Sequence, residues 1–219
     1  MNLSQPRLVL VCAVMLVATI AIASKEYTAP RALPAKTYPA HDEHPTENLT
    51  IAADPYDIPD KTSPVFILPY RDKGYLPIHL VITNDGDQPV SLAAIEVRLV
   101  TANRTKLQPA TTDDLYRRFS RVARRGDEPS RNPLPIPLPR KPDAGLPKGG
   151  ADEILNAQFR ARAVEPHGTQ AGFLFFDIEG VRQPLEGAHL YITGVRDANG
   201  TDLMFFDVPL EKYLSAGPK

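Results

Sequence analysis

The chain is poor in the residues that cross-link or ligate through sulfur. Cys12 is the only cysteine among 219 residues, and tryptophan is absent. Cys12 lies in an apolar stretch near the N-terminus, so a chain that lost this stretch would have no disulfide, thiol nucleophile or thiolate metal ligand. No small residues precede Cys12 as a lipid-attachment site would require, so we do not expect a lipoprotein.

The chain also lacks a strong net charge and the common catalytic motifs. Its 25 Lys and Arg residues nearly balance 26 Asp and Glu residues, which leaves a net charge of −1. Such a chain has no overall field that attracts nucleic acid, so we expect no nucleic-acid partner. It contains no G-x-S-x-G, H-E-x-x-H, Walker A or G-x-G-x-x-G motif. We therefore expect neither an enzyme nor a bound cofactor or metal.

Apolar residues are concentrated at the N-terminus. Arg7 is followed by an apolar stretch over residues 8–23 that ends in Ala21-Ile22-Ala23. A positive residue, a short apolar core and an A-x-A site are the parts of a secretory signal peptide. The alternative is an uncleaved membrane anchor, since a span needs about 17 residues. Either interpretation predicts an exported protein, periplasmic or extracellular, with an anchor through residues 8–23 if cleavage fails.

We expect residues 1–23 to be removed on export, because the A-x-A site stands where signal peptidase would cut. The intact mass of the protein purified from its native cells measures this directly. A mass that includes Met1 would identify the stretch as a retained anchor.

Proline is abundant and unevenly placed. Eight of the 23 prolines lie between Pro30 and Pro69, and seven lie between Pro129 and Pro147. Residues 24–47 show no apolar periodicity, which predicts a disordered, Pro-rich linker. Within it, His41-Asp42-Glu43-His44 has the residue types of a metal site, but a solvated charge run fits a disordered linker better.

The alternation of apolar residues predicts strands. Leu76, Ile78, Leu80 and Ile82 fall on one side of residues 75–84, and His79 falls on the opposite side, which we expect to be exposed. After a turn, the alternation resumes over residues 95–99, with a bulge near residues 93–94, and the two strands are expected to pair at the centre of a sheet. Further strands are predicted at residues 49–53, 65–68, 171–178, 189–195 and 203–208. The last two of these are joined by a turn at 197–200.

These strands predict a mainly β protein, an antiparallel immunoglobulin-like β-sandwich over residues 48–214. A helical and proline-rich insertion occupies residues 111–158, and residues 215–219 form a tail. Within the insertion, Thr111-Thr112 can cap a helix, and a second helix is expected from Asp152. The prolines of residues 129–150 predict a stiff arm between the two helices.

The first helix of the insertion carries the only strong local charge. Its apolar stripe is Leu115, Phe119 and Val122, and around the stripe stand Arg117, Arg118, Arg121, Arg124 and Arg125. These arginines could contact an anionic membrane surface, which makes lipid a candidate partner. Alternatively they form a solvated helix face, paired with acidic neighbours such as Asp113 and Asp114.

Acidic residues leave two further hypotheses open. Calcium could bind at the turns that hold Asp85 and Asp87, or Asp197, Asn199 and Asp202, although the spacing of an EF-hand is missing. Asp177 and Asp207 each follow a Phe-Phe pair, and two carboxylates that met could do acid–base chemistry. Carboxylates that serve turns and strand ends explain the same residues without a ligand.

Three segments together resemble a known group of proteins. They are VITNDGDQPVSLAAIEVRLVTANRTKL from Val81, VEPHGTQAGFLFFDI from Val164, and LYITGVRDANGTDLMFFDVPL from Leu190. They are similar to exported bacterial immunoglobulin-like domains of unknown function, over about residues 48–214. The chain departs from their pattern at His167, which separates Pro166 from Gly168, at Asn103-Arg104, where Gly is expected, and in the insertion. The resemblance implies a fold and no catalytic residues or ligand.

The function expected from the sequence is that of an exported, non-enzymatic interaction or scaffold domain of the bacterial cell envelope, with an unknown partner. The alternative is an extracytoplasmic hydrolase or small-molecule-binding protein, with its site between the sheets and the insertion. A deep pocket lined by paired carboxylates or histidines would favour the alternative. A filled core with bare polar sheet faces would favour an interaction domain.

Overall fold

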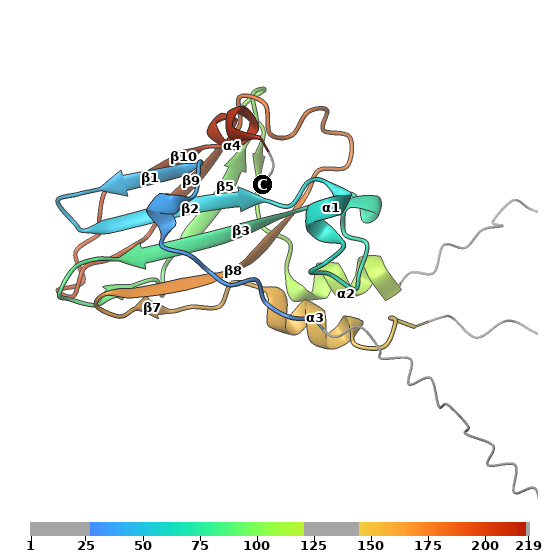
Figure 1. Cartoon of the computed structure of the whole chain (residues 1–219), viewed down its shortest axis with the longest axis horizontal. Helices are drawn as coiled ribbons and strands as arrows, with labels where there is room; N and C mark the ends of the chain where they lie inside the picture. The colour runs from blue at the N-terminus through green and yellow to red at the C-terminus, as the bar shows by residue number, and fades with distance from the viewer. Residues whose placement is uncertain (1–26, 121–144, 218–219) are drawn as a thin grey trace, which may run out of the picture.

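A computed structural model describes residues 27–120 and 145–217 of the chain (Figure 1). The fold is mainly antiparallel β with few helices, which confirms the predicted class. Two four-stranded sheets form its body. A separate ribbon pairs β4 (Val90–Ser91) with β7 (Ala163–Val164).

The first sheet has the strand order β1-β2-β3-β8, and every neighbouring pair is antiparallel. Its strands are β1 (His41–His44), β2 (Leu49–Pro55), β3 (Tyr75–Asn84) and β8 (Gly168–Asp177). β3 lies between β2 and β8 and pairs with β8 along its whole length. Both sides of the β3 backbone are therefore occupied within this sheet.

The second sheet has the order β10-β9-β5-β6, also antiparallel. Its strands are β5 (Glu96–Val100), β6 (Lys106–Leu107), β9 (His189–Thr193) and β10 (Phe206–Pro209). The predicted hairpin between the last two strands is confirmed: Ile192 pairs with Phe206. Asp197 stabilises the turn between them by accepting hydrogen bonds from the Asn199 and Thr201 backbone N–H groups at 2.9 and 2.8 Å.

The two sheets share one apolar core. Alternate side chains of β3 point into it, and they meet alternate side chains of the second sheet. From β3 these are Leu76, Ile78, Leu80 and Ile82, and from the second sheet Leu99, Leu190, Ile192, Phe206 and Val208, all with no exposed surface. The predicted apolar stripe of β3 is thus confirmed as core.

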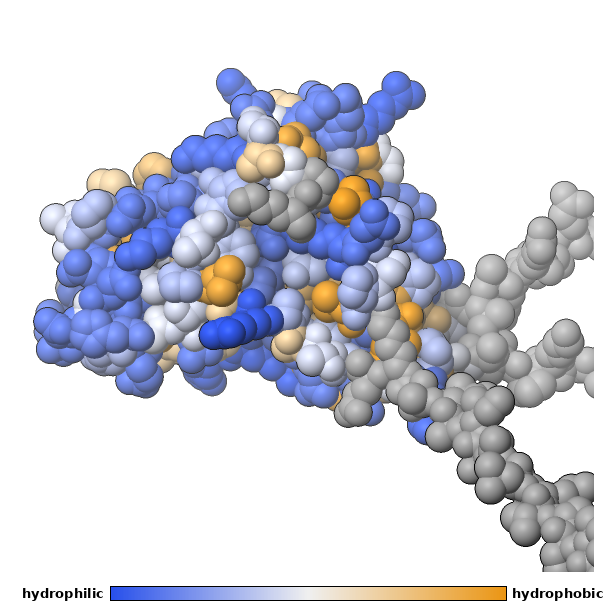
Figure 2. Space-filling model, in the orientation of Figure 1, coloured by the Kyte–Doolittle hydropathy of each residue, from blue (hydrophilic) through white to orange (hydrophobic). Residues whose placement is uncertain are grey.

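The first sheet is also covered on its outer face, and we call it the covered sheet. The covering parts are η1 (Ala35–Thr37), α2 (Thr112–Ser120), α3 (Gly150–Ala157) and the segment 56–70, through Tyr56, Phe66, Leu68 and Tyr70. This segment contains α1 (Pro59–Thr62) and leads into η2 (Arg71–Lys73). In Figure 1 the N-terminal segment crosses this sheet, and the helices stand at one end of it. Figure 2 shows the same side as largely hydrophilic, with only small separate hydrophobic areas, because the covering segments present polar side chains outward.

This covering overturns the prediction that His79 is a surface residue. All ten residues of β3 are buried, and His79 is 3% exposed. Its ring packs against Phe173, with ring centroids 4.8 Å apart, and against Tyr56 at 6.3 Å. The period-2 pattern predicts one buried face, but segments distant in sequence supply aromatic rings that bury the other face of β3 as well.

The predicted linker over residues 24–47 is wrong for its described part, residues 27–47. Ala35 and Ala40 have no exposed surface, and β1 pairs with β2. The Ala35 N–H donates to Thr83 Oγ1 at 2.8 Å. Alanine side chains allow this segment to lie close against β2 and β3, where it adds a strand to the sheet and covers part of its outer face. It does so without the apolar periodicity by which a strand or helix is predicted from sequence.

Two strand predictions also need correction. Residues 75–84 and 95–99 do not pair with one another, because β3 already has two partners and the chain crosses to the second sheet before β5. Residues 65–68 form no strand, although Phe66 and Leu68 are buried. The Glu153 carboxylate accepts hydrogen bonds from the backbone N–H groups of Ile67 and Leu68, which takes the place of a strand partner.

The last element of the described chain is α4 (Glu211–Ala216), which packs on the core through the buried Tyr213.

The described part of the insertion is integral to the fold, since Leu115 of α2 and Ile154 of α3 are fully buried against the covered sheet. Residues 129–144 of the predicted arm and residues 1–23 lie outside the described part. Among the described residues, no helix has the length and apolar character needed to cross a membrane.

Candidate functional site

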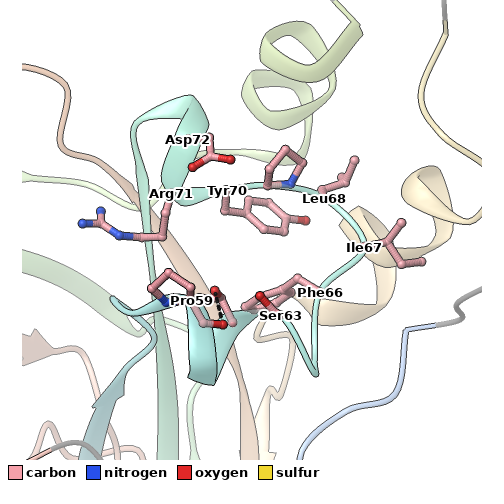
Figure 3. A pocket seen from close by; sticks show the side chains of 10 residues that line it. Pro59, Ser63, Phe66, Ile67, Leu68, Tyr70, Arg71 and Asp72 are labelled. Atoms are coloured by element: carbon pink, nitrogen blue, oxygen red, sulfur yellow. Dashed lines mark hydrogen bonds between the residues drawn. The ribbon is translucent and has the colours of Figure 1, made fainter.

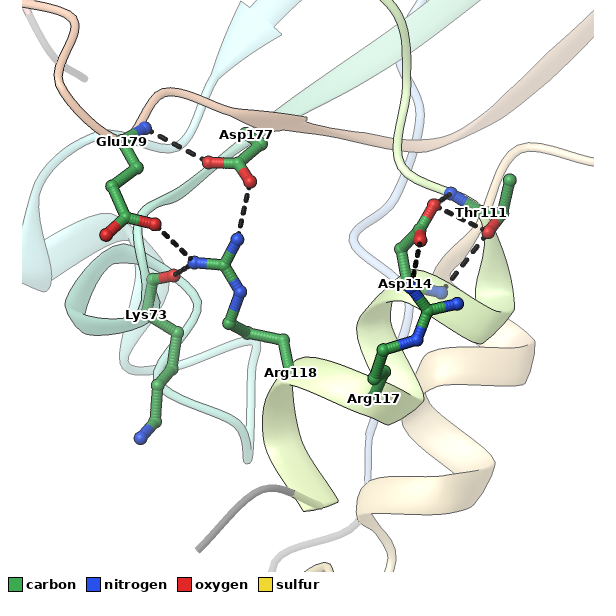
Figure 4. Close-up of polar contacts among 7 residues, drawn as sticks. All are labelled: Lys73, Thr111, Asp114, Arg117, Arg118, Asp177 and Glu179. Atoms are coloured by element: carbon green, nitrogen blue, oxygen red, sulfur yellow. Dashed lines mark hydrogen bonds and ion pairs between the residues drawn. The ribbon is translucent and has the colours of Figure 1, made fainter. Parts of the chain in front are cut away.

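The predicted arginine cluster begins on α2, whose start is fixed by a reciprocal cap (Figure 4). The Asp114 N–H donates to Thr111 Oγ1 at 3.2 Å, and the Thr111 N–H donates to Asp114 Oδ2 at 3.1 Å. This is the capping-box arrangement, with Asp in the acidic position. Hydrogen bonds from Thr111 lower the pKa of the Asp114 carboxyl. The predicted helix start is confirmed.

Arg118 is held by two carboxylates and a carbonyl (Figure 4). Its guanidinium donates to Asp177 at 2.5 Å, to Glu179 at 2.9 Å and to the Lys73 carbonyl at 3.1 Å. It also lies over the Tyr75 ring, 5.1 Å from the centroid. Two negative charges therefore neutralise Arg118, and it joins α2 to the end of β8 rather than facing a partner.

Arg117 is the more available cation on α2. Its side chain is 60% exposed and lies 3.6 Å from Asp114. Arg121, Arg124 and Arg125 lie outside the described residues. Contact of this cluster with an anionic surface thus stays a prediction that depends on Arg117 and these three arginines, and Arg118 is removed from it. A shallow groove of about 380 Å³ beside α2 is lined by Asp114 and Asp177, but each carboxylate is already bonded.

We expect Arg118→Gln to lower the free energy of unfolding by about 1 kcal/mol, since it breaks a network of partly exposed ion pairs that joins two elements. Arg117→Gln, the matched control, is expected to change it by less than about 0.5 kcal/mol, because this pair is long and solvated. Urea unfolding of both variants measures the difference. Equal effects would show that Arg118 does not join α2 to β8.

A second hollow lies inside the segment that joins α1 to η2 (Figure 3). It encloses about 400 Å³ and opens to solvent, and Pro59, Phe66, Tyr70 and Arg71 line it. Phe66 and Tyr70 pack edge to face with centroids 5.0 Å apart, and Arg71 Nε donates to the Asp57 carbonyl at 3.2 Å. The Arg71 guanidinium points away from the rings in this view, so the hollow lacks the convergent polar groups of a small-molecule site.

A partly buried ion pair lies on β2 beyond the end of β1. Lys61 of α1 donates to Asp54 of β2, and its ammonium lies 4.7 Å from the Tyr56 ring centroid and 4.6 Å from that of Tyr213. Tyr213 Oη donates to Asp57 at 2.7 Å. Burial raises the pKa of the Asp54 carboxyl, against the attraction of Lys61. Every charged group here has a partner, and the cluster attaches α1 and α4 to the sheet.

The other candidate ligands are also engaged in structure. Asp202 accepts from Arg196 at 2.7 Å, while Asp42 accepts from the Asp207 N–H at 2.8 Å. His44 stacks on Phe206 with centroids 3.8 Å apart, so the segment His41-Asp42-Glu43-His44 joins the edges of the two sheets. Asp177 bonds to Arg118 and Asp207 to His189, so the two carboxylates do not act as a pair.

Among the described residues, no group of three or more His, Cys, Asp and Glu side chains could hold a metal ion.

The outer face of the second sheet differs from that of the first, and we call it the open face. The strand register places Arg98, Tyr191 and Asp207 side by side in one row across β5, β9 and β10. The next row is Val100, His189 and Pro209, and Glu96 lies opposite Thr193 on the other side. None of these eight residues is buried, while their neighbours in each strand point into the core.

Two exposed apolar side chains precede β10, and one of them, Phe205, lies on the open face. Met204 is 68% exposed and Phe205 47% exposed. The Phe205 ring lies 5.1 Å from that of Tyr191, at an angle of 34°. Tyr191 and Phe205 therefore form an aromatic platform on the polar sheet face, at its β9–β10 side.

Sequence reasoning missed this platform. The alternation over residues 189–195 and 203–208 gave the strands but did not single out their outward residues. One feature of the sequence could have revealed it: Met204, Phe205 and Phe206 are three large apolar residues in succession. A strand with one buried face needs an apolar residue only at every second position, so such a run places at least one of them outward.

No family model matches the chain, and no curated protein matches it. Among solved structures, the chain is similar to the crystal structure of a conserved hypothetical protein from Bacillus anthracis. The two are 14% identical, the match covers 84% of this chain and 96% of that chain, and the TM-score is 0.30. At this TM-score the similarity establishes neither a shared fold nor a shared function.

Proposed function

We propose that this protein is an exported, non-enzymatic interaction domain of the bacterial cell envelope, built on an immunoglobulin-like β-sandwich. The N-terminal apolar stretch and the resemblance to exported domains support export to the cell envelope. The observation that carries the function is the asymmetry of the two sheets: one is covered on its outer face, while the other leaves an aromatic platform exposed. In this proposal the open face is the contact surface.

The state of the charged groups favours this function over the alternative of a hydrolase or small-molecule binder. A general acid or base needs a pocket that brings it to a substrate. The hollows beside α2 and within residues 59–72 are open, and the carboxylates that line the groove beside α2 are bonded to Thr111 and Arg118. Exposed aromatic side chains on a rigid sheet are, by contrast, typical anchors of a binding surface.

Photocrosslinking in native cells tests the proposal. We would place a photoreactive amino acid at Glu96, which is exposed on the open face, and in a matched control at Lys212, which is exposed on α4. The proposal predicts a high-mass adduct from position 96 that is absent, or much weaker, from position 212. Equal adduct formation from both positions, or none from position 96, would contradict it.

A further inference from the structure

The size of the open face limits what can occupy it. Three strands spaced about 4.8 Å apart, over five residues of about 3.4 Å each, span roughly 14 by 17 Å, a projected area of roughly 240 Å². A standard protein–protein interface buries about 800 Å² on each partner. The platform and its polar rows alone thus offer less area than one side of a standard interface, which favours a narrow ligand over a folded protein or a second copy of this chain.

The charges of the open face balance one another. Arg98 donates to Glu96 at 2.8 Å, and Asp207 lies 3.1 Å from His189. The strand register also places the exposed Lys106 of β6 opposite Val100 on this face. Two cations, Arg98 and Lys106, thus stand against two carboxylates, Glu96 and Asp207, so the face offers neither the cationic track that a phosphate backbone needs nor an anionic site for a basic peptide. Charge balance selects a neutral ligand.

These charged side chains still have hydrogen-bonding capacity. A guanidinium has five N–H donors, and Arg98 uses one nitrogen for Glu96. The carboxylates of Glu96 and Asp207 each have a second oxygen, and Thr193 adds a hydroxyl beside them. Donors and acceptors therefore alternate around the platform, as recognition of vicinal hydroxyl groups requires.

The aromatic platform supplies the apolar part of the contact. Tyr191 and Phe205 have an electron-rich ring face, which attracts the weakly positive C–H groups of a saturated ring. A pyranose has one such apolar C–H face, with hydroxyl groups directed outward at its rim. On the open face the two rings lie beside hydrogen-bonding groups, with Arg98 and Asp207 on either side of Tyr191, and this matches that arrangement.

We infer that the open face binds a neutral, pyranose-containing polysaccharide, with a sugar ring stacked on Tyr191 and Phe205 and its hydroxyl groups bonded by Arg98 and Asp207. This inference rests on the proposed function, since it names the ligand class of the same contact surface. It places the protein on a glycan of the envelope rather than on another protein.

Titration calorimetry of the exported chain with two neutral hexasaccharides, cellohexaose and chitohexaose, tests the inference. We expect at least one to bind with a dissociation constant of roughly 10 µM to 1 mM, as a small contact allows. Tyr191→Ala and Phe205→Ala should each weaken binding at least about tenfold, with melting temperatures close to that of the wild type. Leu155→Ala, which removes another exposed apolar side chain, on α3, is the matched control and should bind like the wild type.

Two results would overturn the inference: no binding of either hexasaccharide, or binding that Tyr191→Ala and Phe205→Ala leave unchanged. Tighter binding of an anionic hexagalacturonate that survives 0.5 M salt would also contradict the argument from paired charges. If the sugars fail while position 96 still crosslinks to a protein, the glycan inference is wrong and the proposed function stands. If neither the sugars nor the crosslinker report a contact, both are wrong.

Discussion

Truncation of Phe173 to Ala is expected to destabilise the protein by about 3–5 kcal/mol, the usual cost of removing a buried phenylalanine ring from a packed core. Phe173 has no exposed surface, and it lies on the outer face of the covered sheet. Its ring centroid is 4.9 Å from that of Tyr56, 4.8 Å from that of Phe66 and 4.8 Å from that of His79. Without it, the segments that cover the sheet would face a cavity.

Phe205→Ala is the matched control, because this phenylalanine is 47% exposed and contacts one other ring. We expect it to change stability by less than about 1 kcal/mol, as most surface substitutions do. Urea unfolding followed by circular dichroism measures both variants. A Phe173→Ala variant as stable as Phe205→Ala would mean that residues 56–70 and the two insertion helices do not cover the sheet in solution.

Acidification is expected to cost the folded state about 3 kcal/mol between pH 6.5 and 4 because of His79. Burial, assisted by the positive charge of Lys61, lowers the pKa of the His79 imidazole to about 4, from its ordinary value of 6.5. In that range the unfolded chain binds a proton that the folded chain does not, so stability falls as the pH is lowered. The loss begins near the unfolded pKa and is complete once the pH passes below about 4.

His79→Leu removes this titration and should flatten the dependence. Asp54 acts in the opposite sense, because burial raises its pKa and the folded chain then takes up a proton before the unfolded chain does. The difference in unfolding free energy between the wild type and His79→Leu cancels the contribution of Asp54, which both retain. A difference that is constant from pH 7 to pH 4 would show that His79 is solvated or hydrogen-bonded in its charged form.

The strand pattern predicted most of the core from sequence, because burial of one sheet face leaves an alternation that a few residues reveal. Leu76 to Ile82 of β3 are an example. The pattern could not say which strands are neighbours: residues 75–84 and 95–99 are adjacent in sequence yet belong to different sheets. Pairing depends on which backbone edges remain free, and β3 has none after β2 and β8 have paired with it.

The second face of β3 was beyond sequence reasoning for a related reason. His79 and Thr83 are polar residues at outward positions, and their burial depends on Phe173 and on the Ala35 N–H, both distant in the chain. The start of the arginine helix was predicted where it occurs, but the sequence did not show what Arg118 contacts. Asp177 and Glu179, about sixty residues further on, neutralise Arg118.

The surface to which we assign the function, the open face, follows from the register of three strands rather than from any motif. Tyr191 and Phe205 meet because Ile192 pairs with Phe206, which sets their side chains diagonally on one face. The sequence does not reveal this register, nor that residues 27–120 and 145–217 leave the outer face of this sheet uncovered. A sheet face can therefore carry a binding function without leaving a recognisable spacing in the sequence.

Hydroxyl-radical footprinting in the intact envelope tests the central claim most directly. Phe205 is 47% exposed, and its ring lies against that of Tyr191, so both aromatic side chains can react in the isolated protein. If the open face is the contact surface, oxidation of Phe205 and Tyr191 will fall several-fold in intact envelopes, while Leu214, 40% exposed on α4, keeps its rate. Equal oxidation of Phe205 and Tyr191 in isolated protein and in envelopes would contradict the account.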